Sequence, residues 1–186
     1  MLNYIVREEC AIGYSKELEI LSKADFPVFC GCLLGNKELD LIAEEEVVIS
    51  QDGVIQLKKL IPVEILYADG HDSGDTGLIW SQHHVEFSKF ILDFKPKNVL
   101  EIGGGHGKLA KHCLEKSDIK WTIVEPNPTY KNPKVQYIES FFNVDYLRKY
   151  GAYDTIIHSH TLEHIYNPHN FLGDIYSLLN GGGGDI

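Results

Sequence analysis

An apolar strand that runs directly into a cluster of glycines constrains this 186-residue chain more than any other feature. Residues 99–102 read VLEI, residues 103–107 read GGGHG, and a helix is expected from Lys108. Glycine allows positive φ and lets a ligand approach the backbone closely, and the first amides of a helix have no partner within it. The order of strand, glycine turn and helix therefore predicts a nucleotide-binding turn.

The spacing of the glycines excludes two of the folds that use such a turn. A P-loop needs glycine five residues before its Gly-Lys pair and Ser or Thr after it, but Ile102 and Leu109 hold these positions. The dinucleotide fingerprint G-x-G-x-x-G, counted from Gly103, would place its last glycine where Lys108 stands. The pattern that fits is acidic-x-Gly-x-Gly-x-Gly, formed by Glu101, Gly103, Gly105 and Gly107.

A second carboxylate supports the same interpretation. The expected strand at residues 121–124 is followed by Glu125, which comes 24 residues after Glu101. A carboxylate at the end of the second strand can accept hydrogen bonds from two ribose hydroxyls. Either feature alone is weak evidence, but together they favour a bound nucleoside.

The rest of the pattern predicts an α/β fold with a Rossmann-like parallel sheet. Strands are expected at 98–102, 121–124, 135–138 and 153–158, and helices at 108–116 and 170–179. Strands that alternate with helices imply right-handed crossovers and a sheet covered on both faces. We expect three parts: a small β-rich module at 1–60, a helical linker or lid at 61–96 with a helix at 78–93, and the Rossmann-like domain at 97–186.

Two further segments complete a resemblance to a known family. Residues 153–164 read YDTIIHSHTLEH and residues 171–182 read FLGDIYSLLNGG. With the glycine turn and Glu125, they resemble class I S-adenosylmethionine-dependent methyltransferases over residues 97–184. The resemblance implies S-adenosylmethionine as cofactor and a role for each matching residue. The cofactor-binding residues would be Glu101, Gly103, Gly104 and Gly105 at the methionine and ribose, Glu125 at the ribose hydroxyls, and Pro126, Asn127, Ser140 and Phe141 around the adenine.

The histidines that follow the fourth strand are the candidates for acid–base chemistry. The resemblance implies that His158 and His160 face the sulfonium and the methyl acceptor. An imidazole titrates near neutral pH, so we favour His160, then His158, as the general base, with a purely structural role as the alternative. Tyr67 and His71 are further candidates for lining the acceptor pocket. His83 and His84, on an expected helix, are predicted to be solvated or partly packed.

The amino-terminal part resembles sugar C-methyltransferases that act on nucleotide-linked keto-sugars. The matching stretches are residues 10–13, 53–57, 67–74 and 83–87. The resemblance implies a sugar, nucleotide-sugar or polysaccharide precursor as the substrate. In that family two Cys-x-x-Cys pairs hold zinc, but here Cys10 is followed by Gly13, and the second pair reads Ile49 and Asp52. A structural zinc needs four ligands, so we expect a degenerate module without metal, although residues 30–32 (CGC) could supply substitutes.

The net charge and the hydropathy of the sequence argue against two classes of partner, nucleic acids and membranes. The net charge of −10 argues against nucleic acid, because phosphate binding needs a basic face, and it disfavours anionic membranes for the same reason. No apolar run approaches the roughly 18 residues that span a bilayer, and the first residues do not resemble a signal peptide. The cytoplasm is the expected compartment.

The carboxyl end of the sequence suggests a truncated domain. The resembling family has seven strands, whereas this sequence predicts four and reaches a fifth only at Asp185-Ile186. The glycine run at 181–184 would follow from a guanine-rich tract in the gene, where slippage would shift the reading frame; a gene without repeated guanines there would contradict this hypothesis. The alternative to an enzyme is an inactive fragment, or a binding module that keeps the nucleotide pocket and contacts a full-length homologue.

Overall fold

The computed structural model describes residues 2–28, 41–67, 77–128 and 131–180, which form two compact units. The amino-terminal unit comprises residues 1–69 and 166–169, and the sheet unit comprises residues 70–165 and 170–186. Each unit is described by itself. No helix within the described ranges is both long enough and apolar enough to cross a membrane.

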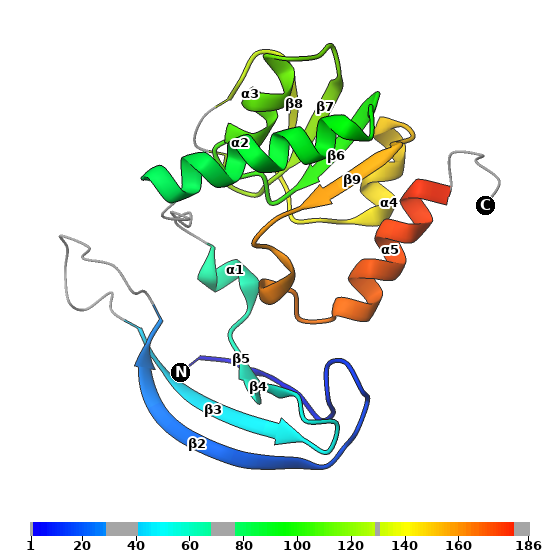
Figure 1. The fold of residues 1–186 in the computed structure, drawn as a ribbon. Coiled ribbons are helices and arrows are strands. Elements are labelled where there is room, and N and C mark those ends of the chain that lie inside the picture. Colours follow the sequence, from blue (N-terminus) through cyan, green and yellow to red (C-terminus); the bar gives the residue numbers. More distant parts are fainter. Residues whose placement is uncertain (1, 29–40, 68–76, 129–130, 181–186) are drawn as a thin grey trace. The chain divides into compact units, whose positions relative to one another are not determined.

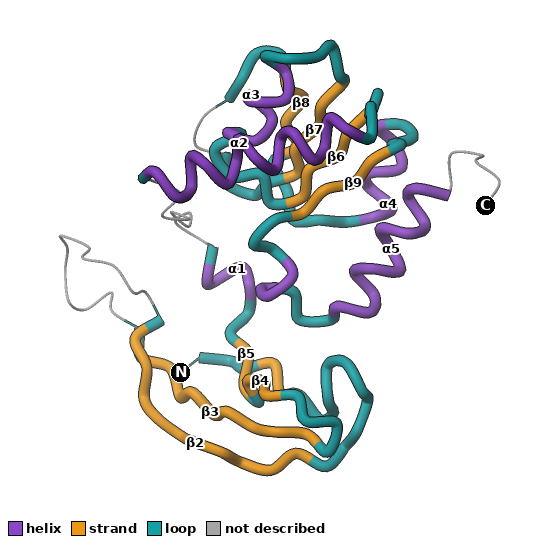
Figure 2. Tube along the Cα trace, viewed as in Figure 1, coloured by secondary structure: helices purple, strands orange, loops and turns teal. Residues whose placement is uncertain are grey.

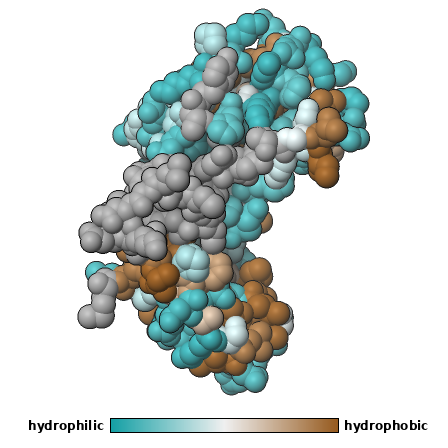
Figure 3. Space-filling view, turned by 90° about the vertical axis from the view of Figure 1, so that its left-hand side faces the viewer, coloured by the Kyte–Doolittle hydropathy of each residue, from teal (hydrophilic) through white to brown (hydrophobic). Residues whose placement is uncertain are grey.

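The amino-terminal unit is built from short antiparallel strands and one helical turn. Strand β1 (Ile5–Val6) pairs with β5 (Lys59–Leu60), and β2 (Leu18–Pro27), β3 (Ile42–Ser50) and β4 (Ile55–Leu57) form a sheet in that order. Helix α1 (Val63–Leu66) follows β5. In the face drawn in Figure 3, hydrophobic side chains gather on this unit, and its exposed apolar residues include Ile20, Leu21, Phe26, Ile42 and Ile55.

The sheet unit has four parallel strands in the order β8-β7-β6-β9 (Figures 1 and 2). In chain order its elements are α2 (Leu78–Asp93), β6 (Asn98–Ile102), α3 (Lys108–Leu114), β7 (Lys120–Val124), β8 (Val135–Ile138), α4 (Val144–Leu147), the 3₁₀ turns Arg148–Tyr150 and Leu162–His164 with β9 (Thr155–His158) between them, and α5 (Pro168–Asn180). The predicted α/β fold with a parallel Rossmann-like sheet is confirmed.

Alternate residues of each strand pack on opposite faces of this sheet, because successive side chains of a strand point to opposite sides. Val99 and Trp121 join Ile91 of α2 and Leu109 of α3 in one core, so α2 and α3 cover that face. Leu100 belongs to a second core on the other face, together with Leu147 of α4 and Phe171 and Leu178 of α5. Both faces are therefore covered, as an apolar parallel sheet requires.

The observed elements α4, α5 and β9 differ from the expected ones, and for the two helices the residue at the first turn explains the difference. Helix α5 begins at Pro168 rather than residue 170, because the missing N–H of proline costs nothing at a first helical position. The short helix α4 was not predicted; Asn143 caps it by accepting a hydrogen bond from the Tyr146 amide at 2.9 Å. Strand β9 begins at Thr155 rather than Tyr153.

The carboxylate of Asp154 joins the starts of two neighbouring strands. One of its oxygens accepts hydrogen bonds from the amides of Lys97 and Asn98 at 2.9 and 3.0 Å, while the backbone amide of Asp154 donates to the carbonyl of Asn98. These bonds fix where β9 starts beside β6, and the same strands carry the site at their other ends.

We expect Asp154→Ala to lower the free energy of unfolding by about 1–3 kcal/mol, because two amides lose a charged acceptor. Chemical denaturation of the purified chain measures the change. Glu86→Ala is the matched control, since it removes only an exposed pair with Lys89, worth about 0.3–0.5 kcal/mol. Equal losses of unfolding free energy in the two variants would contradict this role for Asp154.

Candidate functional site

The strand order places the topological switch point of the sheet at the carboxyl ends of β6 and β9. After β6 the chain adds β7 and then β8 on one side, and it returns to place β9 on the other side of β6. Helix α3, which follows β6, packs on one face, and α5, which follows β9, packs on the opposite face. Ligands of open α/β sheets bind at this kind of switch point, because the two loops diverge there.

The glycine turn at this switch point fits tightly on one side and is open on the other. Gly103 has a φ of 72°, and a β-carbon built on it would lie 2.7 Å from Oγ1 of Thr161. Gly105 also has a positive φ, of 47°, but nothing lies within 4 Å of where its β-carbon would be. A side chain is thus excluded at Gly103 by the protein itself, while the backbone at Gly105 faces open space that a ligand can occupy.

The carboxylate of Glu125 lies beside this open backbone. One of its oxygens accepts a hydrogen bond from the Gly105 amide at 3.3 Å, and the other accepts from the Asn127 amide at 3.1 Å. Each carboxylate oxygen can accept a second hydrogen bond, so two acceptor positions are left for a ligand. The geometry fits a nucleoside whose ribose hydroxyls donate to Glu125 and whose backbone contacts come from the turn.

Glu101 has a partner inside the protein. Its carboxylate is buried and accepts a hydrogen bond from Nε1 of Trp121 at 2.8 Å. A β-carbon on Gly104 would lie 2.9 Å from the carboxyl carbon, so Glu101 supports the turn from beneath. Burial raises the pKa of Glu101 to about 8, with a smaller rise from Glu125, although the bond from Trp121 opposes the shift. Its contact with a cofactor stays a prediction.

The other predicted adenine contacts follow β7 and β8. Pro126 and Asn127 come directly after Glu125 and are half-buried. The backbone amide of Ser140 donates to the carbonyl of Ile138, its hydroxyl donates to the carbonyl of Phe141, and the ring of Phe141 is 41% exposed. All four residues therefore lie at the carboxyl ends of the strands, and their cofactor contacts stay predictions.

The two candidate histidines turn to different surroundings. His158, in β9, lies edge-on to Phe171 of α5 with ring centroids 5.5 Å apart, and burial lowers its pKa while Glu163 opposes that shift. His160 lies beyond the strand with a φ of 54°, and its exposed ring contacts Trp80 of α2 at 4.6 Å. The carboxyl end of β9, at the switch point, therefore carries one half-buried imidazole and one exposed imidazole.

The positions that the sequence linked to a degenerate zinc module lie close together in the amino-terminal unit. Sγ of the buried Cys10 accepts a hydrogen bond from the Gly13 amide at 3.2 Å, and a β-carbon on Gly13 would overlap the carboxylate of Asp52. Within the described ranges, no group of three or more His, Cys, Asp or Glu is arranged to hold a metal ion. Cys30 and Cys32 lie outside the described residues, as does His71, and Tyr67 belongs to the amino-terminal unit.

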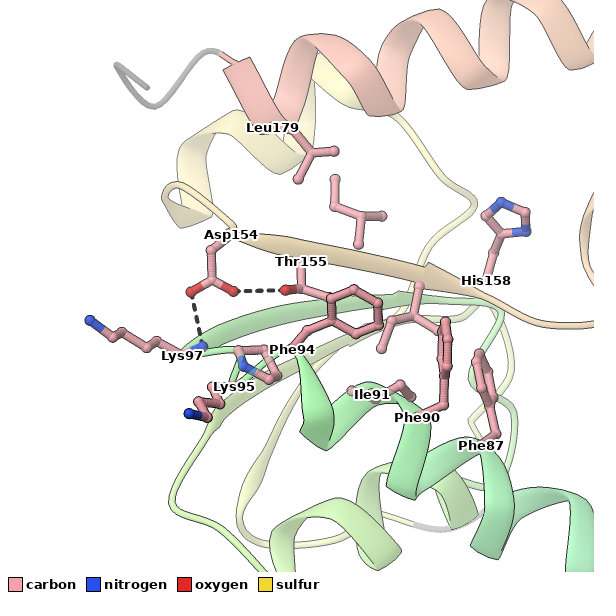
Figure 4. Close-up of a pocket in the computed structure, with 13 residues that line it drawn as sticks. Phe87, Phe90, Ile91, Phe94, Lys95, Lys97, Asp154, Thr155, His158 and Leu179 are labelled. Atoms are coloured by element: carbon pink, nitrogen blue, oxygen red, sulfur yellow. Dashed lines mark hydrogen bonds between the residues drawn. The ribbon is translucent and has the colours of Figure 1, made fainter. Parts of the chain in front are cut away.

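An apolar groove runs along the outer edge of β9 (Figure 4). Its volume is about 770 Å³, and it is lined by Phe90 and Phe94 of α2, Ile156 of β9 and Leu179 of α5, among others. Within the described residues β9 pairs only with β6, so its other edge carries unpaired backbone groups. The glycine turn does not line this groove, so the groove is separate from the candidate nucleoside site.

Sequence reasoning missed the residues that fasten the loop after β9. The hydroxyl of Thr161 lies 3.2 Å from the carbonyl oxygens of both Ile102 and Ser159, to which it donates. Trp80, predicted as an apolar position of the helix, and His83, predicted to be solvated or partly packed, both pack on the ring of His160. Their three-residue spacing on one helix face was the available signal, but the sequence did not say which loop this face meets.

A family model described as a methyltransferase domain matches residues 79–184, more than half of the chain, so the chain belongs to this family of methyltransferase domains. The match confirms the predicted class of domain, whose cofactor is S-adenosylmethionine. It begins within α2 and spans the whole described sheet. Among curated proteins, none has a sequence that matches this chain.

Solved structures show a more distant likeness. The plantazolicin methyltransferase BpumL in complex with a monoazolic desmethylPZN analogue and SAH is 19% identical, with a TM-score of 0.42, and the match covers 53% of this chain and 42% of that one. A spermidine synthase in complex with the transition-state analogue AdoDATO is 16% identical, with a TM-score of 0.41, over 88% of this chain and 54% of that one. The chain therefore spans less than half of the BpumL chain in this match.

The buried carboxyl of Glu101 predicts a distinctive dependence of stability on pH. The folded protein keeps this proton up to about pH 8, whereas the unfolded chain releases it near the ordinary value of 4.5. Stability therefore falls as pH rises between these values, by up to about 1.4 kcal/mol per pH unit for this group. Glu101→Gln removes the penalty and keeps an acceptor for Trp121, so its stability relative to the native chain should increase from pH 5 to pH 8.

Chemical denaturation at pH 5, 6.5 and 8 measures the difference. Glu115→Gln, on an exposed residue just after α3, should give a difference that does not change with pH. A constant difference for Glu101→Gln would contradict the raised pKa.

Proposed function

We propose that this chain is an S-adenosylmethionine-dependent methyltransferase of the cytoplasm that acts on a sugar, nucleotide-sugar or polysaccharide precursor. The observation that carries the cofactor assignment is the open backbone at Gly105 beside the Glu125 carboxylate, at the switch point of a methyltransferase-domain sheet. The sugar is supported by the resemblance of residues 10–92 to sugar C-methyltransferases. BpumL and the spermidine synthase carry different ligands, so they lend the sugar no support.

Residues at the carboxyl ends of β6, β7 and β8 would each bind a different part of the cofactor. The turn at Gly103 to Gly105 would take the methionine and ribose portions, since its backbone leaves room for them. Glu125 would accept the ribose hydroxyls with the lone pairs that its two amide donors leave over. Pro126, Asn127, Ser140 and Phe141 would border the adenine, where the partly exposed ring of Phe141 offers a stacking face.

S-adenosylmethionine supplies an electrophilic methyl group on a sulfonium, so the protein mainly orients the acceptor and removes its proton. A sugar hydroxyl, or a carbon next to a carbonyl, must lose a proton as it takes the methyl group. His160 would accept that proton, because its ring is exposed and it lies in the loop that Thr161 fastens to the end of β6. His158 is the second choice, since its ring packs against Phe171.

The test of the cofactor site is calorimetric titration with S-adenosylmethionine. We expect the native chain to bind and Glu125→Ala to lose at least about tenfold in affinity, because the ribose hydroxyls lose their charged acceptor. Glu115→Ala, on an exposed carboxylate at the end of α3, should bind like the native chain. A folded native chain without affinity, or equal affinities of the two variants, would contradict the proposed site.

The groove on β9 supports a second candidate function, a binding module that associates with a second copy or a full-length homologue. Strand edges with unpaired backbone groups accept a strand of another chain, and this edge lies between exposed apolar side chains. Phe90 is 58% exposed and Phe94 68% exposed. Such a chain would keep the nucleoside pocket while its partner supplies the activity.

Replacing an exposed groove residue should weaken association and spare the fold. We expect Phe90→Glu to weaken self-association at least about tenfold in sedimentation velocity, because a charge would have to be buried in the interface. Leu78→Glu is the matched control, since Leu78 is exposed on the same helix and does not line the groove. Equal association of the two variants, or a native chain that stays monomeric, would contradict this second function.

A further inference from the structure

His160 is held in an unfavourable backbone conformation. Its φ of 54° is rare for a residue with a side chain and costs on the order of 1 kcal/mol. Its Nδ1 lies 2.9 Å from the hydroxyl oxygen of Ser159, within hydrogen-bond distance. With Nδ1 engaged in this way, Nε2 is the nitrogen available for proton transfer.

Two rings of α2 fix the imidazole from the side. The ring of Trp80 lies 4.6 Å from that of His160, inclined at 66°, and the ring of His83 lies 5.3 Å away, inclined at 79°. Trp80 and His83 are three residues apart and therefore share one face of the helix. The edge-to-face arrangement of all three rings is the favourable one for aromatic contacts.

The side chain of His84, the neighbouring histidine of α2, packs on a different residue. The ring of His84 stacks on His112 of α3 with centroids 6.5 Å apart. His83 and His84 are adjacent in sequence, but the ring of His83 contacts His160 and the ring of His84 contacts His112. This pair gives the helix an internal control for any effect of one imidazole on His160.

We propose that His83 is a positioning residue for methyl transfer, which together with Trp80 and Ser159 holds the imidazole of His160 in one orientation. The inference rests on the proposed function, in which His160 takes the proton of the acceptor. Edge-to-face contacts with the rings of Trp80 and His83 hold the plane of the imidazole. In this orientation Nδ1 carries the hydrogen and donates it to the Ser159 hydroxyl oxygen, which leaves the lone pair on Nε2.

The chemical step that this arrangement serves couples removal of a proton from the acceptor to transfer of the methyl group. The bond between the acceptor's oxygen or carbon and its proton breaks as the new bond to the methyl group forms. The bond between the methyl carbon and sulfur breaks with its electron pair going to sulfur, and the proton goes to Nε2 of His160. The substrate class implied is an acceptor that has a proton to lose, rather than an amine already present as a free base.

The titratable groups around His160 are few in the described part of the chain. His83 faces it from α2, and His84 and His112 lie further along the row of rings. Glu163 and His164 follow in the same loop, in the 3₁₀ turn, and Glu163 acts on His158. His83 is the titratable residue of α2 whose ring contacts that of His160, which makes its removal the informative change.

Histidine side-chain NMR of the full 186-residue chain tests the proposal. Nitrogen–proton correlation spectra give the tautomer of His160 in the native chain and its variants. We expect the proton of His160 on Nδ1 in the native chain, and a mixture of tautomers in His83→Gln, or in His83→Asn as a second variant, because the ring loses an edge-to-face contact that holds it beside Ser159. His84→Gln should leave the tautomer unchanged, and Ser159→Ala should alter the balance of tautomers.

Calorimetry with S-adenosylmethionine on the same samples separates the inference from the function on which it rests. The same tautomer of His160 in His83→Gln and His84→Gln, with cofactor binding retained, would overturn the role of His83 alone. Absence of cofactor binding in every folded sample would overturn the proposed function, and the role of His83 in methyl transfer with it. A changed tautomer balance on removal of His83 but not of His84, with binding retained, is the result expected.

Discussion

The lack of a side chain at Gly103 is the constraint on which the candidate site depends. A β-carbon there would meet the hydroxyl of Thr161, and that hydroxyl donates to the carbonyl of Ile102 at the end of β6. The loop after β9 is thereby fastened to the strand that carries the glycine turn. Since the same loop contains His160, one contact sets the distance between the cofactor turn and the candidate base.

Features governed by local pattern could be read from the sequence. The bounds of α2, β6 and β8 coincide with the expected ones, because an apolar strand beside a glycine turn and a long amphipathic helix have strong local signals. The two-residue strands β1 and β5 could not be found in this way, since they exist only through pairing across more than fifty residues. The four-residue helix α4 is too short to show a period.

The same distinction holds for the site. Glu125 could be predicted, because it follows directly from the spacing of the second strand, and the structure gives its carboxylate the Gly105 amide. The burial of Glu101 under the turn depends on Trp121 of the neighbouring strand, which only the paired sheet brings close. The packing of the His160 ring on Trp80 of α2 could not be predicted, because β9 ends at His158 and the positive φ of His160 departs from strand geometry.

The central claim is that the turn from Gly103 to Gly105 receives S-adenosylmethionine, and glycine amide NMR tests it most directly. With ¹⁵N-glycine in the chain, titration with S-adenosylmethionine should shift the amide signals of Gly103, Gly104 and Gly105. The amides of Gly151 and Gly173, which belong to the same unit but precede β9 and lie in α5, should stay in place. Unchanged signals of the turn at saturating cofactor, or equal shifts at all five glycines, would contradict the account.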